Sequence, residues 1–436
     1  MKNNRLPKIS WALYDWANSA FATTVMAGFF PIFFKSYWAN PDDPVQSTFY
    51  LGLANSVASI IIAALAPILG AIADKGSVRK KLLMAFAFFG IILTGSLRIL
   101  EQGLWEWAIL FYVSATVGWT GANIFYDSLL PTVSVRKDVD IVSSLGYSLG
   151  YAGGGLLFLL NVFMFINYEW FGFATSAGAI KASFLMVAVW WAVFTIPLIL
   201  FVKEPKTREK IGFLRAVKAG WKQLRLTLAD LKHFKIVAMF LLAYWLYIDG
   251  VDTIVRMAVD YGKSLNFSDF TLITALLMVQ FIAFPAALAY GWLAGRIGPK
   301  KAVLYGIVGY IFITFFGYFM QQEWHFYFLA AMVGLFQGGI QAISRSLYSR
   351  IIPHNKAAEF FGFYNMLGKF AAVIGPVLMG SVTVITGSSR VGILSILVLF
   401  ISGGLLLWRV DIQKGEEYAD KYLSEKIQNT SQAGRP

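Results

Sequence analysis

The stretch Tyr14-Asp15-Trp16-Ala17-Asn18-Ser19 places a carboxylate, an amide and a hydroxyl inside an apolar run that covers residues 11–38. A run of this length can cross a bilayer, which needs about 20 mostly apolar residues. An acid inside a spanning helix costs a few kcal/mol or more, so it usually faces a protein interior or a wet cavity. The stretch therefore predicts a membrane-spanning helix that lines a polar path.

The composition of the whole chain is typical of a membrane protein. Of its 436 residues, 58% are hydrophobic and 14% are charged, whereas soluble domains carry about 25% charged residues. The net charge of +13 comes from short basic clusters between apolar runs, which indicates topology and lipid contact rather than a nucleic-acid-binding face. The chain has no Cys, which excludes disulfides and thiolate chemistry. The first apolar run is too long and too polar for a signal peptide.

Twelve apolar runs follow one another along the chain, and each is long enough to be a transmembrane helix. They cover residues 11–38, 48–73, 81–100, 104–130, 142–166, 182–202, 236–259, 267–293, 302–320, 324–352, 360–386 and 391–408. The loops between them are alternately basic and nearly free of Lys and Arg. By the positive-inside rule, the basic loops and both termini are cytoplasmic. We expect a multi-pass protein of the bacterial inner membrane.

The widest break between runs covers residues 203–235 and divides the chain into two sets of six. It is rich in Lys and Arg, and apolar residues recur in it at helical spacing. This pattern predicts an amphipathic helix on the inner membrane surface, or alternatively a helix that binds a partner. The expected organisation is a six-helix half at 1–202, a linker at 203–235, a second half at 236–409 and a tail at 410–436, which we expect to contain a short helix.

A short pattern of glycine, acid and basic residues follows the second run of each half. In the first half it consists of Gly70, Asp74, Lys75, Arg79 and Lys80. In the second half the matching residues are Gly291, Gly295, Arg296, Lys300 and Lys301, with Gly295 in the place of the acid. Glycine allows helices to approach closely, and the acid can stabilise a helix N-terminus or pair with a cation. The alternative is a basic loop that only sets the topology.

The Gly70 loop resembles the signature loop of the major facilitator superfamily, where it is a cytoplasmic gate element. Residues 14–21, 247–253, 337–346 and 359–364 resemble a branch of that superfamily that includes the autophagy-related fungal vacuolar effluxers and their bacterial relatives. The resemblance implies an all-α fold with 12 transmembrane helices in two pseudo-symmetric six-helix halves. It also implies alternating access and export of small organic solutes, which in the fungal relatives are amino acids.

Two pairs of polar residues share a spacing of three, which places each pair on one helix face. They are Asp15 with Asn18, and Asp249 with Asp252 in the first run of the second half. A desolvated Asp can take up a proton, and inward proton movement could drive export of a solute. The alternative is a structural role as a helix cap or an interhelical hydrogen bond.

Arg345 lies on one helix face with Gln337 and Gln341, where it could hold a substrate carboxylate or phosphate. Its alternative role is to pair with an acid such as Asp127. The expected substrate or proton path contains Asp15, Asn18, Asp249, Asp252, Gln337, Gln341, Arg345 and Lys369. The expected gate contains Gly70, Asp74, Lys75, Arg79, Lys80, Asp127 and Arg296.

These features predict a secondary active transporter that exports a small organic solute, such as an amino acid or another zwitterion, in exchange for protons. The alternatives are a transporter or flippase of a lipid or amphiphile, and a membrane sensor or scaffold that transports nothing. His233, His325 and His354 are not spaced as metal ligands, and we expect no enzymatic activity, metal or cofactor. The expected partners are the solute, protons and membrane lipids, without nucleic acid, and the expected state is a monomer.

Overall fold

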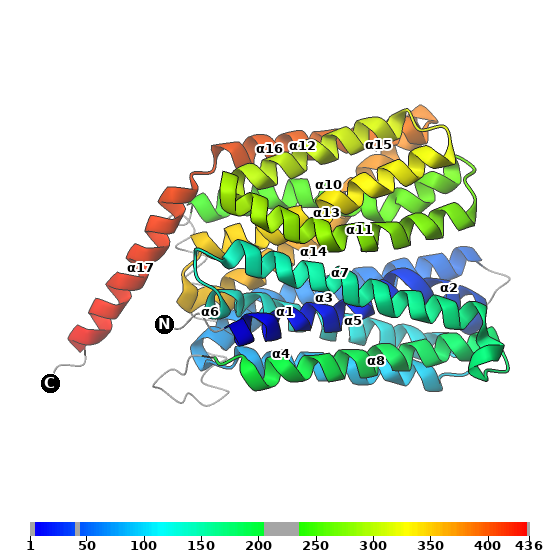
Figure 1. The fold of residues 1–436 in the computed structure, drawn as a ribbon, viewed down its shortest axis with the longest axis horizontal. Coiled ribbons are helices and arrows are strands. Elements are labelled where there is room, and N and C mark those ends of the chain that lie inside the picture. Colours follow the sequence, from blue (N-terminus) through cyan, green and yellow to red (C-terminus); the bar gives the residue numbers. More distant parts are fainter. Residues whose placement is uncertain (1–4, 40–43, 205–234, 434–436) are drawn as a thin grey trace.

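The computed structural model describes residues 5–39, 44–204 and 235–433, and every regular element within them is a helix. The long helices run along one common direction, and both chain termini lie at the same end (Figure 1). We call this end the terminal face and the other end the opposite face. The predicted amphipathic helix at 203–235 falls almost wholly outside the described residues.

The first half of the chain forms the lower bundle in Figure 1. Its first span begins as an α-helix and continues through a π-helical segment, a widened helix that is often found at functional sites. The elements are α1 (Arg5–Ala20), η1 (Phe21–Phe29), α2 (Phe30–Phe33), η2 (Phe34–Trp38), α3 (Pro44–Gly76), α4 (Arg79–Ser96), η3 (Leu97–Ile99), α5 (Trp105–Ser128), α6 (Leu130–Val133), α7 (Val139–Ile166), η4 (Tyr168–Phe171) and α8 (Ser176–Phe201).

The second half forms the upper bundle in Figure 1. A final helix leaves it at the terminal face and points away from both bundles. The elements are α10 (Lys235–Ser264), α11 (Asp269–Ile297), α12 (Pro299–Tyr318), α13 (Glu323–Ile351), η6 (His354–Lys356), α14 (Ala357–Thr386), α15 (Ser389–Ser395), α16 (Leu397–Arg409) and α17 (Ile412–Ala433). With 22 residues, α17 is longer than the short helix expected in the tail.

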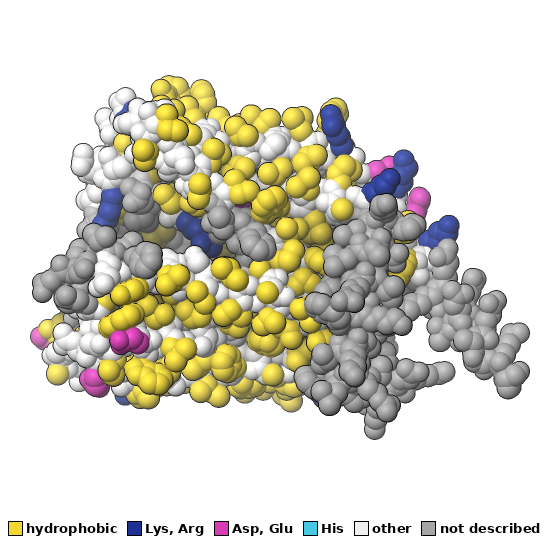
Figure 2. Space-filling view, turned by 180° about the vertical axis from the view of Figure 1, so that it is seen from behind, with side chains coloured by type: hydrophobic (Ala, Val, Ile, Leu, Met, Phe, Trp, Pro, Cys, Tyr) yellow, Lys and Arg dark blue, Asp and Glu magenta, His cyan; other side chains and the backbone are white. Residues whose placement is uncertain are grey.

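Eleven helical segments in the described part of the chain are long and apolar enough to cross a membrane. The expected run at 360–386 lies in α14, where the apolar segment found is the shorter stretch Ile374–Thr386. The expected all-α membrane fold is therefore confirmed, but the count of twelve spans is not. Figure 2 shows the matching surface, in which a broad hydrophobic area separates charged side chains at the two ends.

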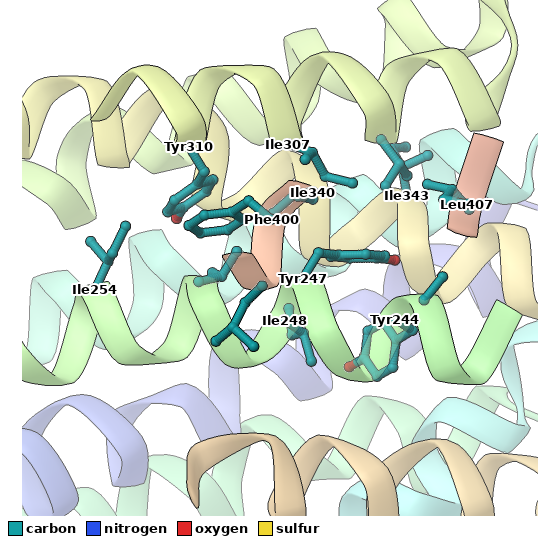
Figure 3. Packing of buried hydrophobic residues seen from close by; sticks show 14 of the residues in the cluster. Tyr244, Tyr247, Ile248, Ile254, Ile307, Tyr310, Ile340, Ile343, Phe400 and Leu407 are labelled. Atoms are coloured by element: carbon teal, nitrogen blue, oxygen red, sulfur yellow. The ribbon is translucent and has the colours of Figure 1, made fainter. Parts of the chain in front are cut away.

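Each bundle has its own apolar core. One buried cluster joins residues between Trp11 and Val202, together with Ala358 of α14, and another joins residues between Val237 and Val410. In the second cluster, Tyr310 of α12 stacks on Phe400 of α16 with ring centroids 5.4 Å apart (Figure 3). The bundles can therefore keep their own packing while the seam between them changes.

The helix pairs α3 with α14 and α7 with α11 form the largest contacts of the seam between the bundles, and α7 also packs on α13 and α5 on α14. A Cβ atom at Gly70 of α3 would collide with the backbone carbonyl of Ala358. A Cβ atom at Gly291 of α11 would collide with the side chain of Ser144 on α7. The glycine of each repeated loop therefore lies where a helix of one half crosses closely over a helix of the other.

Candidate functional site

A cavity of about 520 Å³ lies between the two bundles and is lined by helices of both. Its volume falls in the range of about 300–1,000 Å³ that is typical of small-molecule sites. Six of the eight residues predicted for a substrate or proton path line it, namely Asp15, Asn18, Asp252, Gln337, Gln341 and Arg345. The cavity can hold a small polar solute.

Arg345 closes the end of the cavity nearest the terminal face. It projects from α13 in the second half, but its charged partners belong to the first half. Its Nη1 donates to Oδ1 of Asp127 at 3.0 Å, and its Nη2 lies 3.3 Å from Oδ2 of Asp15. The guanidinium is almost fully buried. The structure thus contains the pairing with an acid that the sequence left open as the alternative for Arg345.

Other groups hold this charge cluster in place. The Nε atom of Arg345 donates to the Ser143 hydroxyl at 3.0 Å, and its guanidinium carbon lies 4.4 Å from the ring centroid of Tyr147. Tyr126 donates its hydroxyl to Asp15 at 2.8 Å. Asn365 donates its amide to Asp127 at 3.1 Å. Because charge-assisted hydrogen bonds are strong in a dry environment, the cluster fixes both halves in one arrangement.

The cluster has an excess of negative charge when all three groups are ionised, because Asp15 and Asp127 share one guanidinium. Buried charges are stable only when they are paired and hydrogen-bonded. A proton or a cation that reached either carboxylate would balance the cluster. It would also weaken the attraction that joins α13 to α1 and α5.

The middle of the cavity is lined by neutral polar groups. Asn18 donates its amide to Asn123 at 2.6 Å, so the carboxamide of the opening stretch faces α5. Tyr151 of α7 donates its hydroxyl to the side-chain oxygen of Gln341 at 3.3 Å. Gln337 lies one helical turn further from the terminal face on the same wall.

Asp252 and Arg256 line the cavity from α10 in the second half. They are four residues apart and therefore on one helix face. Arg256 is exposed to solvent, in contrast to the buried Arg345. Lys369 belongs to α14, but its side chain lies outside the described part of the structure.

Asp249 is placed differently from our expectation, since it does not belong to the cavity lining. It is 1% exposed and points into the second bundle. Its Oδ1 accepts from the backbone N–H of Gly375 at 3.0 Å and from the Thr253 hydroxyl at 3.3 Å. Asp249 and Asp252 share a helix side only approximately, because three residues turn a helix by about 300°. As a result of this angular offset, Asp249 contacts α14 and Asp252 lines the cavity.

The first repeated loop forms a clamp across the seam at the terminal face. Asp74 accepts from the backbone N–H groups of Ala358 at 3.0 Å and Glu359 at 2.8 Å, at the start of α14. A carboxylate there is favoured by the helix dipole. Arg79 lies 2.6 Å from Asp74 and also donates to the carbonyl oxygen of His354 at 3.1 Å. We call these contacts the Asp74 clamp.

Three other expected gate residues have no described contact with the opposite half. The side chain of Lys75 lies outside the described part of the structure. Arg296 of the second loop stacks on Trp292 of its own helix at 3.6 Å. Lys80 donates to the carbonyl oxygens of Ile199 and, at 2.8 Å, of Val202 at the end of α8, within its own half.

Sequence reasoning missed several polar residues on α7 that contact the second half. Asp140 accepts from Arg350 at 2.6 Å and from the Ser346 hydroxyl at 2.7 Å. Ser143 and Tyr147 contact Arg345, as described above. The signal was available, because Asp140, Ser143, Tyr147 and Tyr151 recur every three or four residues and form a polar helix face.

His354 lies at the terminal face beside the clamp, where its carbonyl oxygen accepts from Arg79. Burial lowers the pKa of its imidazole, and the nearby Arg136 lowers that pKa further. Among the described residues no group of three or more His, Asp and Glu side chains could hold a metal ion.

Comparison with known proteins identifies relatives in sequence and solved structures with a similar fold. The sequence profile of the family described as "Vacuole effluxer Atg22 like" matches residues 41–420. The MFS-type transporter YxiO of Bacillus subtilis is 38% identical over 410 residues, which cover 93% of this chain and 95% of YxiO. The human organic anion transporter MFSD10 has a similar structure, with a TM-score of 0.72, 14% identity, and coverage of 93% of this chain and 100% of that one.

A second solved structure with the same fold is that of the proton:xylose symporter XylE. Its TM-score is 0.71 at 14% identity, with coverage of 96% of this chain and 98% of that chain. Similarity at this level of identity concerns the fold. It confirms the major facilitator architecture that the repeated loop predicted.

Proposed function

The chain belongs to the Atg22-like family of major facilitator transporters, and from this premise we propose that it is a secondary active transporter of a small organic solute. The observation that carries the proposal is the cavity between the two halves, whose floor is an ion cluster contributed by both. Solute sites between repeated halves are typical of alternating access. The protein performs no chemistry on the solute.

The terminal face is the cytoplasmic side in this proposal. Its loops carry Arg79, Lys80, Arg136, Lys300 and Lys301, which fits the positive-inside rule. The Asp74 clamp and the Arg345 cluster are then the closed inner gate. The structure is accordingly the outward-facing form of the cycle, in which the solute leaves the cavity to the outside.

A zwitterion such as an amino acid is the preferred solute. The sequence assigned its carboxylate to Arg345, but that guanidinium is occupied by Asp15 and Asp127. Arg256 and Asp252 on α10 are a better pair for the two charges of a zwitterion, because both line the cavity. The carboxamides of Gln337 and Gln341 would then bind polar groups of the solute.

Proton coupling is assigned to Asp15 and Asp127. Protonation of either carboxylate would reduce its attraction for Arg345 and favour opening of the inner gate. A proton that enters from outside would thereby allow the cavity to receive solute from the cytoplasm. The family description names an effluxer, and we extend that direction of transport to this chain.

The test uses the purified chain in liposomes that are loaded with labelled amino acids. We expect release of at least one of them, faster with a pH gradient that is acidic on the side of the opposite face. Asp15→Asn should remove the response to the gradient. A panel of amino acids and other small zwitterions that shows no protein-dependent movement would refute the proposed substrate class.

A further inference from the structure

Asp249 lies in the middle of α10, away from the cavity and in the interior of the second bundle. It is 1% exposed, and its Oδ2 atom is buried without a hydrogen-bond partner among the residues that the structure describes. An intramembrane acid is costly and usually marks an ion or proton site. A buried carboxylate oxygen without a donor is stable when a positive charge neutralises it.

A proline inside α14 lies beside this carboxylate. Gly375 gives its N–H to Oδ1 of Asp249 at 3.0 Å. The next residue, Pro376, lies inside the continuous helix Ala357–Thr386 and has no N–H to give. The regular hydrogen-bond ladder of α14 is therefore incomplete in the turn that contacts Asp249.

The surroundings of Asp249 supply further oxygen and little charge. Thr253 donates its hydroxyl to Oδ1 at 3.3 Å, and Gly375 comes so close that a Cβ atom there would collide with Thr253. Asp252 is the charged group that acts on Asp249 from its own helix. The aromatic ring of Phe400 packs against Gly250 from α16. From α14, the side chain of Lys369 is outside the described set.

We propose that Asp249 binds a small monovalent cation, either a proton or a sodium ion, and that this second site acts together with the Asp15 and Asp127 cluster in coupling transport to an ion gradient. A proton would bond to Oδ2 and leave a neutral carboxylic acid. A sodium ion would be held by Oδ2 and the Thr253 hydroxyl oxygen. Hard cations of this kind prefer oxygen ligands.

The site could act on the inner gate through α14. This helix contains Pro376 in its second half, and its first residues are bound by Asp74 of the other bundle. Helices bend most easily where the hydrogen-bond ladder is interrupted. Occupancy at Asp249 would therefore change how α14 presents its N-terminus to the clamp. This coupling role rests on the transport function proposed above, whereas cation binding itself does not.

The binding test needs no solute. The melting temperature of the purified full chain is measured with rising NaCl against choline chloride at constant ionic strength, and separately across pH. We expect at least one of the two to shift the melting temperature of the unmodified chain. Asp249→Asn should abolish that response, and Thr253→Val should shift its midpoint while preserving the fold.

Asp411→Asn is the control, because it removes an acid of the second half that lies between α16 and α17 and pairs with Lys414. It should keep the cation response. A sodium response that Asp249→Asn removes assigns sodium, and a pH response that it removes assigns the proton. Responses that are the same in the unmodified chain, Asp249→Asn and Thr253→Val would overturn the site. Cation binding without any solute movement in liposomes would instead refute the transport function and leave the site standing.

Discussion

The two copies of the repeated loop keep the same packing but differ in their electrostatics. Gly70 and Gly291 both mark a close crossing between halves. Lys80 of the first copy and Lys300, one position earlier in the second copy, both donate to carbonyl oxygens at the end of a neighbouring helix, α8 and α16 respectively. Only the first copy has the acid that binds the other half, since Gly295 stands where Asp74 would be. The repeat therefore preserves helix packing, whereas the acid that binds the other half is present in the first copy alone.

On the side of the second loop, different residues join the two halves at the terminal face. Asp140, in the first turn of α7, accepts hydrogen bonds from Arg350 and Ser346 of α13. The acid on this side therefore comes from a helix of the first half rather than from the second loop. Arg350 also lies 3.7 Å from Glu416 of α17, which gives it a second partner.

The largest effect in this comparison is expected for Asp74→Asn. The change removes the charge that pairs with Arg79 and that accepts from the start of α14, and breaking a buried ion pair costs about 3–5 kcal/mol. The closed inner gate should weaken by roughly 100-fold or more. The measurement is labelling of a single Thr120→Cys on the cavity wall by an impermeant thiol reagent that is added at the terminal face.

Gly295→Ala is the control for Asp74→Asn, because open space surrounds Gly295. It should leave the labelling unchanged. If both variants labelled at the same rate, the charge of Asp74 would not hold the terminal face closed, and the comparison would fail.

The next largest effect is expected for alanine substitutions at the two glycine crossings. Its size depends on which atoms the added methyl group would contact. Gly70→Ala meets a backbone carbonyl, which cannot move alone, while Gly291→Ala meets the side chain of Ser144. Overpacking costs about 1–3 kcal/mol. The melting temperature should fall more for Gly70→Ala than for Gly291→Ala. The reverse order would mean that the α3–α14 crossing is the looser one.

Asp140→Asn should weaken the gate less than Asp74→Asn. Arg350 retains Glu416 as a partner after this change, whereas Asp74 also holds two backbone N–H groups. Labelling of Thr120→Cys from the terminal face should rise by about tenfold, which corresponds to about 1.4 kcal/mol. An increase as large as that for Asp74→Asn would show that both sides of the seam carry equal weight.

The smallest effects are expected for the two lysines, and they should be equal. Lys80→Met and Lys300→Met each remove a cation at a helix C-terminus, which contributes about 0.3–1 kcal/mol. Both should lower the melting temperature slightly and leave labelling of the cavity unchanged. A large fall in melting temperature for only one of the two variants would mean that the two copies resemble each other only in their glycines.

Much of the fold could be predicted because a bilayer-spanning run can be recognised from its composition alone. The acid and the glycine of the first loop were also found, since a motif with fixed spacing carries them. The partners of Arg345 could not be fixed, because Asp15, Asp127 and Ser143 are distant in sequence and meet only through packing. The sequence predicted Asp249 on the cavity wall, but residue spacing alone cannot determine which neighbouring helix or cavity a given side of a helix faces. The boundaries of the two halves remain a prediction.

The central claim is that the cavity is reached from the opposite face while the Asp74 clamp closes the terminal face. Because the chain has no Cys, a single Ala27→Cys on the exposed cavity wall can report access. In oriented vesicles, an impermeant thiol reagent should label it from the opposite face and not from the terminal face. Adding Asp74→Asn should reverse this preference. Equal labelling from both faces, or labelling that Asp74→Asn does not change, would contradict the account.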